Sequence, residues 1–245
     1  MIKLSVNVNK VATLRNSRGG KIPNVIDAVR VCVKAGAPGI TVHPRADQPH
    51  ITTTDVREVA GELKTSAPAV EFNMEGDPRP DFLSLVGEIR PTQCTLVPVK
   101  PGEITSQAGW PPHTKSSALR PVVEGLQKIG VRVSLFVDAD PDAVRWAADM
   151  AGDRVELYTE PFAREYELGG EHGQASFRRF EKAAELAHSL GLGVNAGHDL
   201  DLHNLTLFKQ LPHLAEVSIG HALISDALLV GLDRAVRDYL NALRQ

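Results

Sequence analysis

The feature that most constrains the fold of this chain is a short apolar run that ends in a polar, usually ionisable residue and occurs eight times. Most of these runs lead into a segment with helical periodicity, so predicted strands and helices alternate along the chain. The runs end at residues 7–9, 43–45, 75, 97–100, 138–140, 156–160, 195–198 and 220–221. Such alternation is typical of βαβ units and a parallel sheet, in which the carboxyl ends of the strands share one edge.

We therefore predict the α/β class and a (β/α)8 TIM barrel with extra short helical excursions. The 245 residues are close to the roughly 250 of one such barrel, and no linker divides them, so we expect a single domain over residues 1–245. An open doubly wound sheet is the structural alternative. That fold normally carries a glycine-rich turn after its first strand, and Val8, Asn9 and Lys10 do not form one.

The boundaries of the elements follow from periodicity and from the residues that begin and end helices. We expect strands over residues 2–8, 39–43, 70–74, 93–97, 131–137, 154–158, 192–195 and 216–219, apolar on both faces as buried parallel strands are. We expect helices over residues 23–35, 82–89, 175–190, 202–208 and 222–243. Three more helices are expected: one that begins after a cap at Thr53 or Thr54, one around residues 119–126, and one that begins at residue 141 after a capping Asp140. Two segments interrupt this alternation, a polar one at 159–173 and a Pro/Gly-rich one at 98–115. We expect the Pro/Gly-rich segment to act as a lid.

Charge and hydropathy exclude some partners. The net charge of −3 argues against nucleic acid, because a phosphate backbone requires a basic surface. No run approaches the ~20 apolar residues of a membrane helix, and the amino terminus reads as a strand and not as a signal peptide. Cys32 and Cys94 lie in apolar patterns without metal-ligand spacing, so we expect buried free thiols. These features together predict a cytoplasmic protein with no membrane partner.

Two histidines and an arginine follow the second predicted strand. His43 stands at the carboxyl end of that strand, where an imidazole can serve as acid or base near neutral pH. Arg45 offers a planar fork for phosphate, and His50 follows in the same loop. A structural histidine or a surface arginine is the alternative for any one of them alone, and their grouping favours a functional site.

Two glutamates are candidate catalytic residues. Glu75 follows the third apolar run, where burial would raise its pKa and make it a base near pH 7; a solvated loop glutamate is the alternative. Glu156 stands between Val155 and Leu157, and a carboxylate inside an apolar strand must face a partner or a polar barrel mouth. Both glutamates are therefore expected at the active end of the barrel.

Glycine–histidine pairs end the seventh and eighth predicted strands. Gly197-His198 and Gly220-His221 place a glycine where backbone amides can approach a ligand closely. The loops after strands seven and eight, with the amino end of the following helix, form the usual phosphate cradle of these barrels. We expect Gly220 and His221 to open the last helix in that role.

Other charged residues near the predicted strand ends allow more than one interpretation. Lys10, Arg15 and Arg18 form a basic cluster in the first loop, which is either a second anion site or a solvated charged loop. Asp138 could face the site, whereas Asp140 is most simply a helix cap. Histidines and carboxylates could converge on a metal, but no compact motif such as His-Glu-x-x-His occurs. Basic residues at the same end favour anions, so we expect no metal and no cofactor.

Several motifs, in order from the first strand to the last helix, resemble those of the pyridoxine 5′-phosphate synthase family. They are Asn7, Ala12-Thr13-Leu14-Arg15-Asn16, Arg18-Gly19, Gly39-Ile40-Thr41-Val42-His43-Pro44-Arg45, His50-Ile51, Leu96-Val97-Pro98, Asn195-Ala196-Gly197-His198 and Ile219-Gly220-His221-Ala222. The resemblance implies a barrel that condenses 1-deoxy-D-xylulose 5-phosphate with 3-amino-2-oxopropyl phosphate. The products would be pyridoxine 5′-phosphate, phosphate and water, in the biosynthesis of pyridoxal phosphate (vitamin B6).

The resemblance also implies roles by position. His43 and Glu75 would accept protons, His198 would donate one, and Glu156 would stabilise the transition state. Contacts to deoxyxylulose phosphate are implied for Arg45, His50 and Thr105. Contacts to the aminoketone phosphate are implied for Asn7, Arg18, Gly220 and His221.

The chain departs from the family pattern at three places. Family members carry Asp-His where this chain has Asn9-Lys10, often a glycine where it has Asp199, and commonly a glutamate where it has Val99. We still place Asn9, Lys10 and Asp199 among the substrate-binding residues, because a lysine can hold a phosphate and the Asp199 amide can donate to one.

The family assembles as dimers and octamers, so a homo-oligomer is expected. Two rival functions remain. One is another phosphosugar barrel enzyme, such as a metal-assisted epimerase. The other is a non-catalytic barrel that binds a phosphorylated metabolite.

Overall fold

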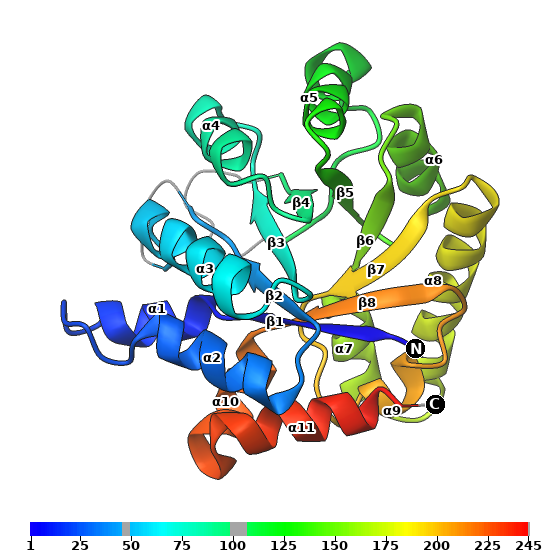
Figure 1. Ribbon diagram of the computed structural model, residues 1–245. Coiled ribbons are helices and arrows are strands. Elements are labelled where there is room, and N and C mark those ends of the chain that lie inside the picture. The colour runs from blue at the N-terminus through cyan, green and yellow to red at the C-terminus, as the bar shows by residue number, and fades with distance from the viewer. Residues whose placement is uncertain (46–49, 99–106, 245) are drawn as a thin grey trace.

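Eight parallel strands pair in chain order, and the last pairs with the first, so that the sheet closes into a barrel (Figure 1). The computed structural model describes residues 1–45, 50–98 and 107–244. The strands are β1 (Lys3–Asn7), β2 (Gly39–Val42), β3 (Glu71–Gly76), β4 (Gln93–Leu96), β5 (Arg132–Val137), β6 (Arg154–Tyr158), β7 (Gly193–Gly197) and β8 (Leu214–Ile219). The predicted barrel is confirmed, and the open doubly wound sheet is excluded.

Helices surround the sheet (Figure 1). They are α1 (Asn9–Asn16), α2 (Val25–Ala35), α3 (Thr53–Ser66), α4 (Pro80–Ile89), α5 (Ser116–Lys128), α6 (Pro141–Asp149), α7 (Glu160–Glu167), α8 (Glu171–Ser189), α9 (Leu205–Phe208), α10 (His221–Val230) and α11 (Leu232–Ala242). Asp140 caps α6 as predicted, accepting hydrogen bonds from the Asp142 and Ala143 amides. Helix α2 is capped by Asn24 and begins at Val25, two residues after the predicted start at Pro23. Helix α3 is capped by Thr52, one residue before the predicted cap at Thr53 or Thr54.

Three segments differ from the sequence-based expectation in the type of element. The predicted first loop is the helix α1, which buries Val11 and Ala12. The predicted polar excursion contains the helix α7, which buries Phe162. The predicted last helix is divided into α10 and α11 because Gly231 has a φ of 87°, a left-handed conformation that interrupts helical hydrogen bonding.

The inner face of the barrel is polar, which contradicts the expectation of strands apolar on both faces. The buried polar residues of the strands are Ser5, Thr41, Asn73, Glu75, Gln93, Thr95, Ser134, Glu156, Asn195 and Glu216. Most of these side chains bond one another: the Ser5 and Thr41 hydroxyl oxygens lie 2.6 Å apart, and Thr95 Oγ1 donates to Asn73 Oδ1 at 3.1 Å. The Ser134 hydroxyl is the exception, with no hydrogen-bond partner among the described residues. This pairing offsets the desolvation of the polar groups.

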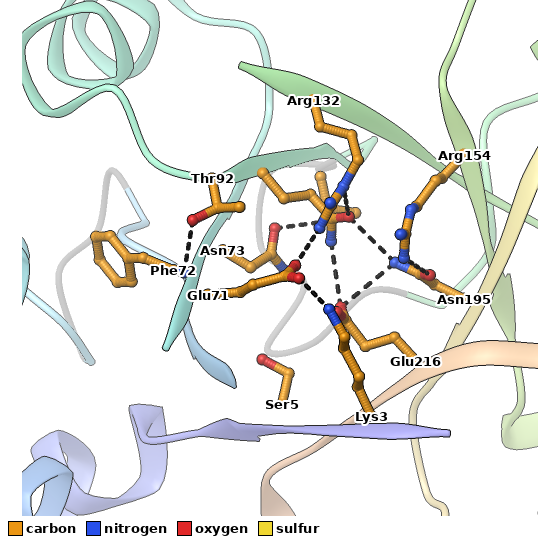
Figure 2. Close-up of polar contacts among 12 residues, drawn as sticks. Lys3, Ser5, Glu71, Phe72, Asn73, Thr92, Arg132, Arg154, Asn195 and Glu216 are labelled. Carbon is orange, nitrogen blue, oxygen red and sulfur yellow. Dashed lines mark hydrogen bonds and ion pairs between the residues drawn. The ribbon is translucent and has the colours of Figure 1, made fainter. Parts of the chain in front are cut away.

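Ionic side chains close the amino end of the barrel. Figure 2 shows Glu71 between Lys3 and Arg132, with a contact to each. Beside them, Arg154 Nη1 donates to Asn195 Oδ1 at 2.8 Å, and Asn195 Nδ2 donates to Glu216 Oε1 at 3.4 Å (Figure 2). These contacts link strands at the end opposite the strand carboxyl termini, as expected for the end of such a barrel that serves stability.

Two further expectations concern burial and the membrane. Cys32 and Cys94 are free and buried, as predicted, and burial raises the pKa of both thiols. In the described part of the chain, none of the helices has the length and apolar character needed to span a bilayer.

Candidate active site

A cavity of about 310 Å³ opens at the carboxyl ends of the strands. Every predicted site residue lines it except Arg18 and Thr105. Thr105 lies outside the described residues, as do positions 99–106 of the predicted lid. Arg18 follows α1 in an exposed position, so its contact with substrate stays a prediction. The four predicted catalytic side chains, His43, Glu75, Glu156 and His198, share this one cavity.

Glu75 lies near the end of β3, within the strand and not after it. Its carboxyl group is buried; Oε2 lies 3.8 Å from His43 Nδ1, and Oε1 accepts a hydrogen bond from Ser218 Oγ at 3.3 Å. Burial raises the pKa of Glu75 to about 7; the charge of Glu216 adds to this shift and the Ser218 hydrogen bond opposes it. The group is therefore balanced between its two protonation states near neutral pH.

Ser218 is a site residue that the sequence reasoning missed. It lines the cavity and is the hydrogen-bond donor to Glu75. A signal was present, because Ser218 is a hydroxyl between the apolar residues Val217 and Ile219. Such a residue needs a partner inside a barrel.

His43 follows β2, and a hydrogen bond to its main chain holds it in place. The main-chain N–H of His43 donates to Asn9 Oδ1 at 2.9 Å. Burial lowers the pKa of His43 to about 3, with a further contribution from the charge of Arg45, so the imidazole is neutral at pH 7. Within the described residues, the buried Nε2 has no hydrogen-bond partner. His43 can therefore offer a neutral ring nitrogen to a bound molecule.

His198 follows β7 with a φ of 84°. The Thr159 hydroxyl donates to the carbonyl oxygens of Gly197 and His198, which holds this turn. The ring packs against Phe136 and Tyr158, with centroids 5.3 Å away in both cases. Burial lowers the pKa of His198, while the neighbouring Asp199 opposes the shift. The imidazole is thus fixed on one side by aromatic packing and is neutral in the ligand-free protein.

Glu156 projects from β6 into the barrel. Thr95 Oγ1 donates to its Oε2 at 3.4 Å. Room for the carboxyl group depends on Gly197, because a Cβ atom there would lie 2.5 Å from Glu156 Oε1. Burial raises the pKa of Glu156, and the charges of Glu75 and Glu216 raise it further, which favours the neutral acid.

Groups that can hold anions surround these four residues. Arg45 and His50 reach the cavity from the segment after β2, and Lys10 reaches it from the first turn of α1. Gly220 and His221 begin α10, where free amides favour a negative group. A Cβ atom on Gly220 would lie 3.0 Å from the side chain of Asn7, so glycine permits this close approach.

The predicted basic cluster of the first loop is divided in the structure. Lys10 lines the cavity. Arg15 instead pairs with Asp55, to which it donates with both terminal nitrogens. Asp138 does not line the cavity either; its Oδ1 accepts a hydrogen bond from the Gly109 amide at 3.1 Å. Among the described residues, Lys10 is thus the member of this cluster that lines the cavity.

The histidines and carboxylates near the strand ends could, from the sequence, have converged on a metal ion. Across residues 1–45, 50–98 and 107–244, no group of three or more His, Cys, Asp or Glu side chains is arranged to hold a metal ion. Basic groups and neutral acids of the described residues instead suit anionic substrates and proton transfer.

Comparison with known proteins identifies relatives over the whole chain. Residues 4–245 match the sequence model of the family described as pyridoxal phosphate biosynthesis protein PdxJ. A pyridoxine 5′-phosphate synthase of Bacteroides thetaiotaomicron is 51% identical over 245 residues, covering 100% of both chains. One of Porphyromonas gingivalis is 49% identical, covering 99% of both.

Solved structures of low sequence identity share the fold. A phosphoribosyl anthranilate isomerase of Thermotoga maritima matches with a TM-score of 0.63 at 10% identity, covering 99% of this chain and 98% of that one. The YdjI aldolase of Escherichia coli K12 matches with a TM-score of 0.61 at 10% identity, covering 99% of this chain and 89% of that one. These likenesses support the barrel architecture.

Proposed function

The chain belongs to the family of pyridoxal phosphate biosynthesis protein PdxJ, and we infer that it is an enzyme that makes pyridoxine 5′-phosphate. It condenses 1-deoxy-D-xylulose 5-phosphate with 3-amino-2-oxopropyl phosphate and releases phosphate and water, a step of vitamin B6 biosynthesis. The observation that carries this function is the near-complete match to the family together with relatives that are about half identical.

We propose that two sets of residues bind the two phosphorylated substrates, most of them lining the cavity. Arg45, His50 and Thr105 would contact the deoxyxylulose phosphate. Asn7, Arg18, Gly220 and His221 would contact the aminoketone phosphate. The second set is supported by the α10 amino terminus, which is suited to an anion. Holding both reactants in one cavity removes much of the entropic barrier to their condensation.

We propose that Glu75 and His43 remove protons during imine formation and ring closure. The raised pKa of Glu75, about 7, supports a base that is ionised in a useful fraction of molecules at neutral pH. The neighbouring neutral imidazole of His43 provides a second acceptor 3.8 Å away. Glu156, as a neutral acid, would donate a hydrogen bond to the charge that develops on the substrates.

We assign the donor role to His198. Bound phosphate places negative charge near the cavity, and negative charge raises the pKa of an imidazole. Substrate binding would therefore protonate a ring that burial keeps neutral in the free protein. A proton delivered from His198 would then assist the loss of water or of phosphate.

The departures from the family pattern fit the same reaction. Asn9 Oδ1 accepts the His43 N–H, which a carboxylate oxygen would also do, so this main-chain contact survives the exchange of aspartate for asparagine. Lys10 keeps a positive group in the cavity. Asp199 has a φ of 56° and its carbonyl oxygen accepts from Asn204 Nδ2 at 2.9 Å, so a second contact fixes the turn after His198.

We further propose that the enzyme works in the cytoplasm as a homo-oligomer. Leu228, Leu229 and Val230, at the end of α10, are 71%, 88% and 53% exposed, and grouped apolar residues on a surface are typical of protein contacts. The free thiols are those of a reducing compartment. Sedimentation velocity checks the assembly; a monomer at micromolar concentration contradicts it.

Turnover of the two substrates by the purified chain tests the function directly. We expect pyridoxine 5′-phosphate to form, detected by its ultraviolet absorbance, with no loss of rate in chelator. Activity that requires an added divalent ion would favour the metal-assisted epimerase. Binding of either substrate without product would favour the non-catalytic barrel.

A further inference from the structure

The helix α1 holds both ends of the segment that carries His43, Arg45 and His50. At its first residue, Asn9 Oδ1 accepts the His43 N–H at 2.9 Å. At its last residue, Asn16 Nδ2 donates to the His50 carbonyl oxygen at 2.8 Å. Residues seven apart lie on one face of a helix, about 10 Å from each other along its axis. One rigid face of α1 therefore contacts the main chain at both positions.

The Asn16 side chain is itself held in orientation. Arg15 Nε donates to Asn16 Oδ1 at 2.9 Å, so the oxygen is occupied and the amide nitrogen is directed to the His50 carbonyl. The Arg15 guanidinium also binds both carboxyl oxygens of Asp55, a bidentate pair. Asp55 Oδ2 in turn accepts from the Thr52 N–H at 2.8 Å and from its hydroxyl at 2.8 Å.

The result is a closed chain of contacts around the His50 main chain. Thr52, two residues after His50, is the cap of α3 and is tied to Arg15 through Asp55. His50 itself is tied to Asn16. The Arg15–Asp55 pair is largely buried, with side chains 15% and 6% exposed, so water screens it little. These contacts fix the point at which His50 enters the cavity.

We propose that Asn16, oriented by Arg15 and Asp55, is the positioning residue for His50 in the binding of the pentulose phosphate. This inference rests on the proposed function, because that function makes His50 a substrate contact. Asn16 is not among the residues that line the cavity, and its side chain contacts the His50 main chain. Arg15, which the sequence had suggested as an anion-binding residue, thereby has the role of orienting the Asn16 side chain.

The variant Asn16→Asp tests this role. It keeps an oxygen for Arg15 and replaces the donor to the His50 carbonyl with an acceptor. We expect the KM for 1-deoxy-D-xylulose 5-phosphate to rise about tenfold, which corresponds to about 1.4 kcal/mol. The KM for the aminoketone phosphate stays within about twofold, as expected when one hydrogen bond to a single subsite is lost. Asn16→Gln, which keeps donor and acceptor, should recover most of the affinity.

A matched control is Asn24→Asp. Asn24 caps α2 only through its oxygen, which accepts from Ile26 and Asp27, so the same chemical change should leave both KM values unchanged. Equal loss for both substrates in Asn16→Asp, together with a lower unfolding temperature, would show a merely structural role and overturn the proposal. Unchanged KM values would also overturn it.

A readout without substrate separates this inference from the function. The His50 imidazole signals in NMR spectra of the free protein should broaden or double in Asn16→Asp, while those of His198 stay single. A single sharp set for His50 overturns the positioning role, whether or not the enzyme makes product. Altered His50 signals in a protein that forms no pyridoxine 5′-phosphate would support the positioning role and refute the function.

Discussion

At the scale of single residues, the barrel interior concentrates carboxyl groups that cannot all ionise. Burial raises the pKa of Glu75, Glu156 and Glu216, and the charge of Glu216 raises the pKa of both others. Hydrogen bonds from Ser218 and Thr95 only partly offset this effect. The site therefore stores protons at neutral pH, which a reaction built on proton transfer requires.

The variant Glu75→Gln should lose activity and gain stability at high pH. The pKa of Glu75 is about 7 in the folded protein and about 4.3 in an unfolded chain. The folded state thus binds the extra proton, and its stability falls as pH rises through this window. Removing the carboxyl should add up to about 4 kcal/mol to the free energy of unfolding above pH 8 and little below pH 4.

Urea unfolding of wild type and Glu75→Gln at pH 4 and pH 8.5 measures this difference. A general base contributes about 10²- to 10⁴-fold, so kcat should fall by that factor above pH 7, where Glu75 of the wild type is ionised, and by less at lower pH, where the wild-type residue is itself protonated. An equal stability change at the two pH values would mean that Glu75 is not the group that titrates near 7.

At the scale of elements, glycines after β8 and at the end of β7 leave room for side chains of neighbouring strands. The end of β7 has no side chain at Gly197, and the Glu156 carboxyl group of β6 occupies that space. The amino end of α10 similarly begins at a glycine that lies against Asn7 of β1. Neighbouring strands thus fit together at the level of single atoms where the cavity begins.

The variant Gly197→Ala should displace Glu156. The new Cβ would lie 2.5 Å from its Oε1, so the carboxyl must move, with a loss of about 1–3 kcal/mol in stability and a fall in kcat. Gly61→Ala, in the middle of α3 with open space around it, is the matched control and should be neutral or stabilising. Differential scanning calorimetry and steady-state kinetics compare the two; normal activity in Gly197→Ala would contradict the fit.

The elements also show what the sequence could and could not predict. Strand β6 was predicted with its observed bounds, although Glu156 interrupts its apolar residues Val155 and Leu157. Helix α1 was missed because its eight residues bury only Val11 and Ala12, too few for a visible apolar stripe. The break at Gly231 was missed because the helical pattern continues across it, although the glycine itself was a signal.

At the scale of the whole molecule, the two ends of the barrel have different tasks. The carboxyl end gathers the cavity residues, and chain order alone brings them together once a closed parallel sheet is predicted. The contacts of Arg15 or Ser218 depend on side-chain packing between distant segments and could not be read from a pattern. The polar inner face was also missed, because each short strand carries only one or two buried polar residues among its apolar ones.

The variant Arg132→Ala tests this division of tasks. Arg132 contacts Glu71 at the amino end of the barrel (Figure 2) and also donates to Gln93 Oε1. Its removal therefore leaves partly buried groups unpaired and should cost about 2 kcal/mol in stability. Urea unfolding should show this loss, while kcat and both KM values at a temperature well below unfolding stay within about twofold. A large fall in kcat of the folded variant would contradict the separation of the two ends.

The most direct test of the central claim, that the four cavity side chains act on one pair of substrates, is the rate of ring formation by His198→Asn. Asparagine keeps a polar group against Phe136 and Tyr158 but cannot deliver a proton as an imidazolium does. We expect the folded His198→Asn variant to bind both substrates and to form pyridoxine 5′-phosphate at least about 100-fold more slowly than wild type. Ring formation at the wild-type rate would contradict it.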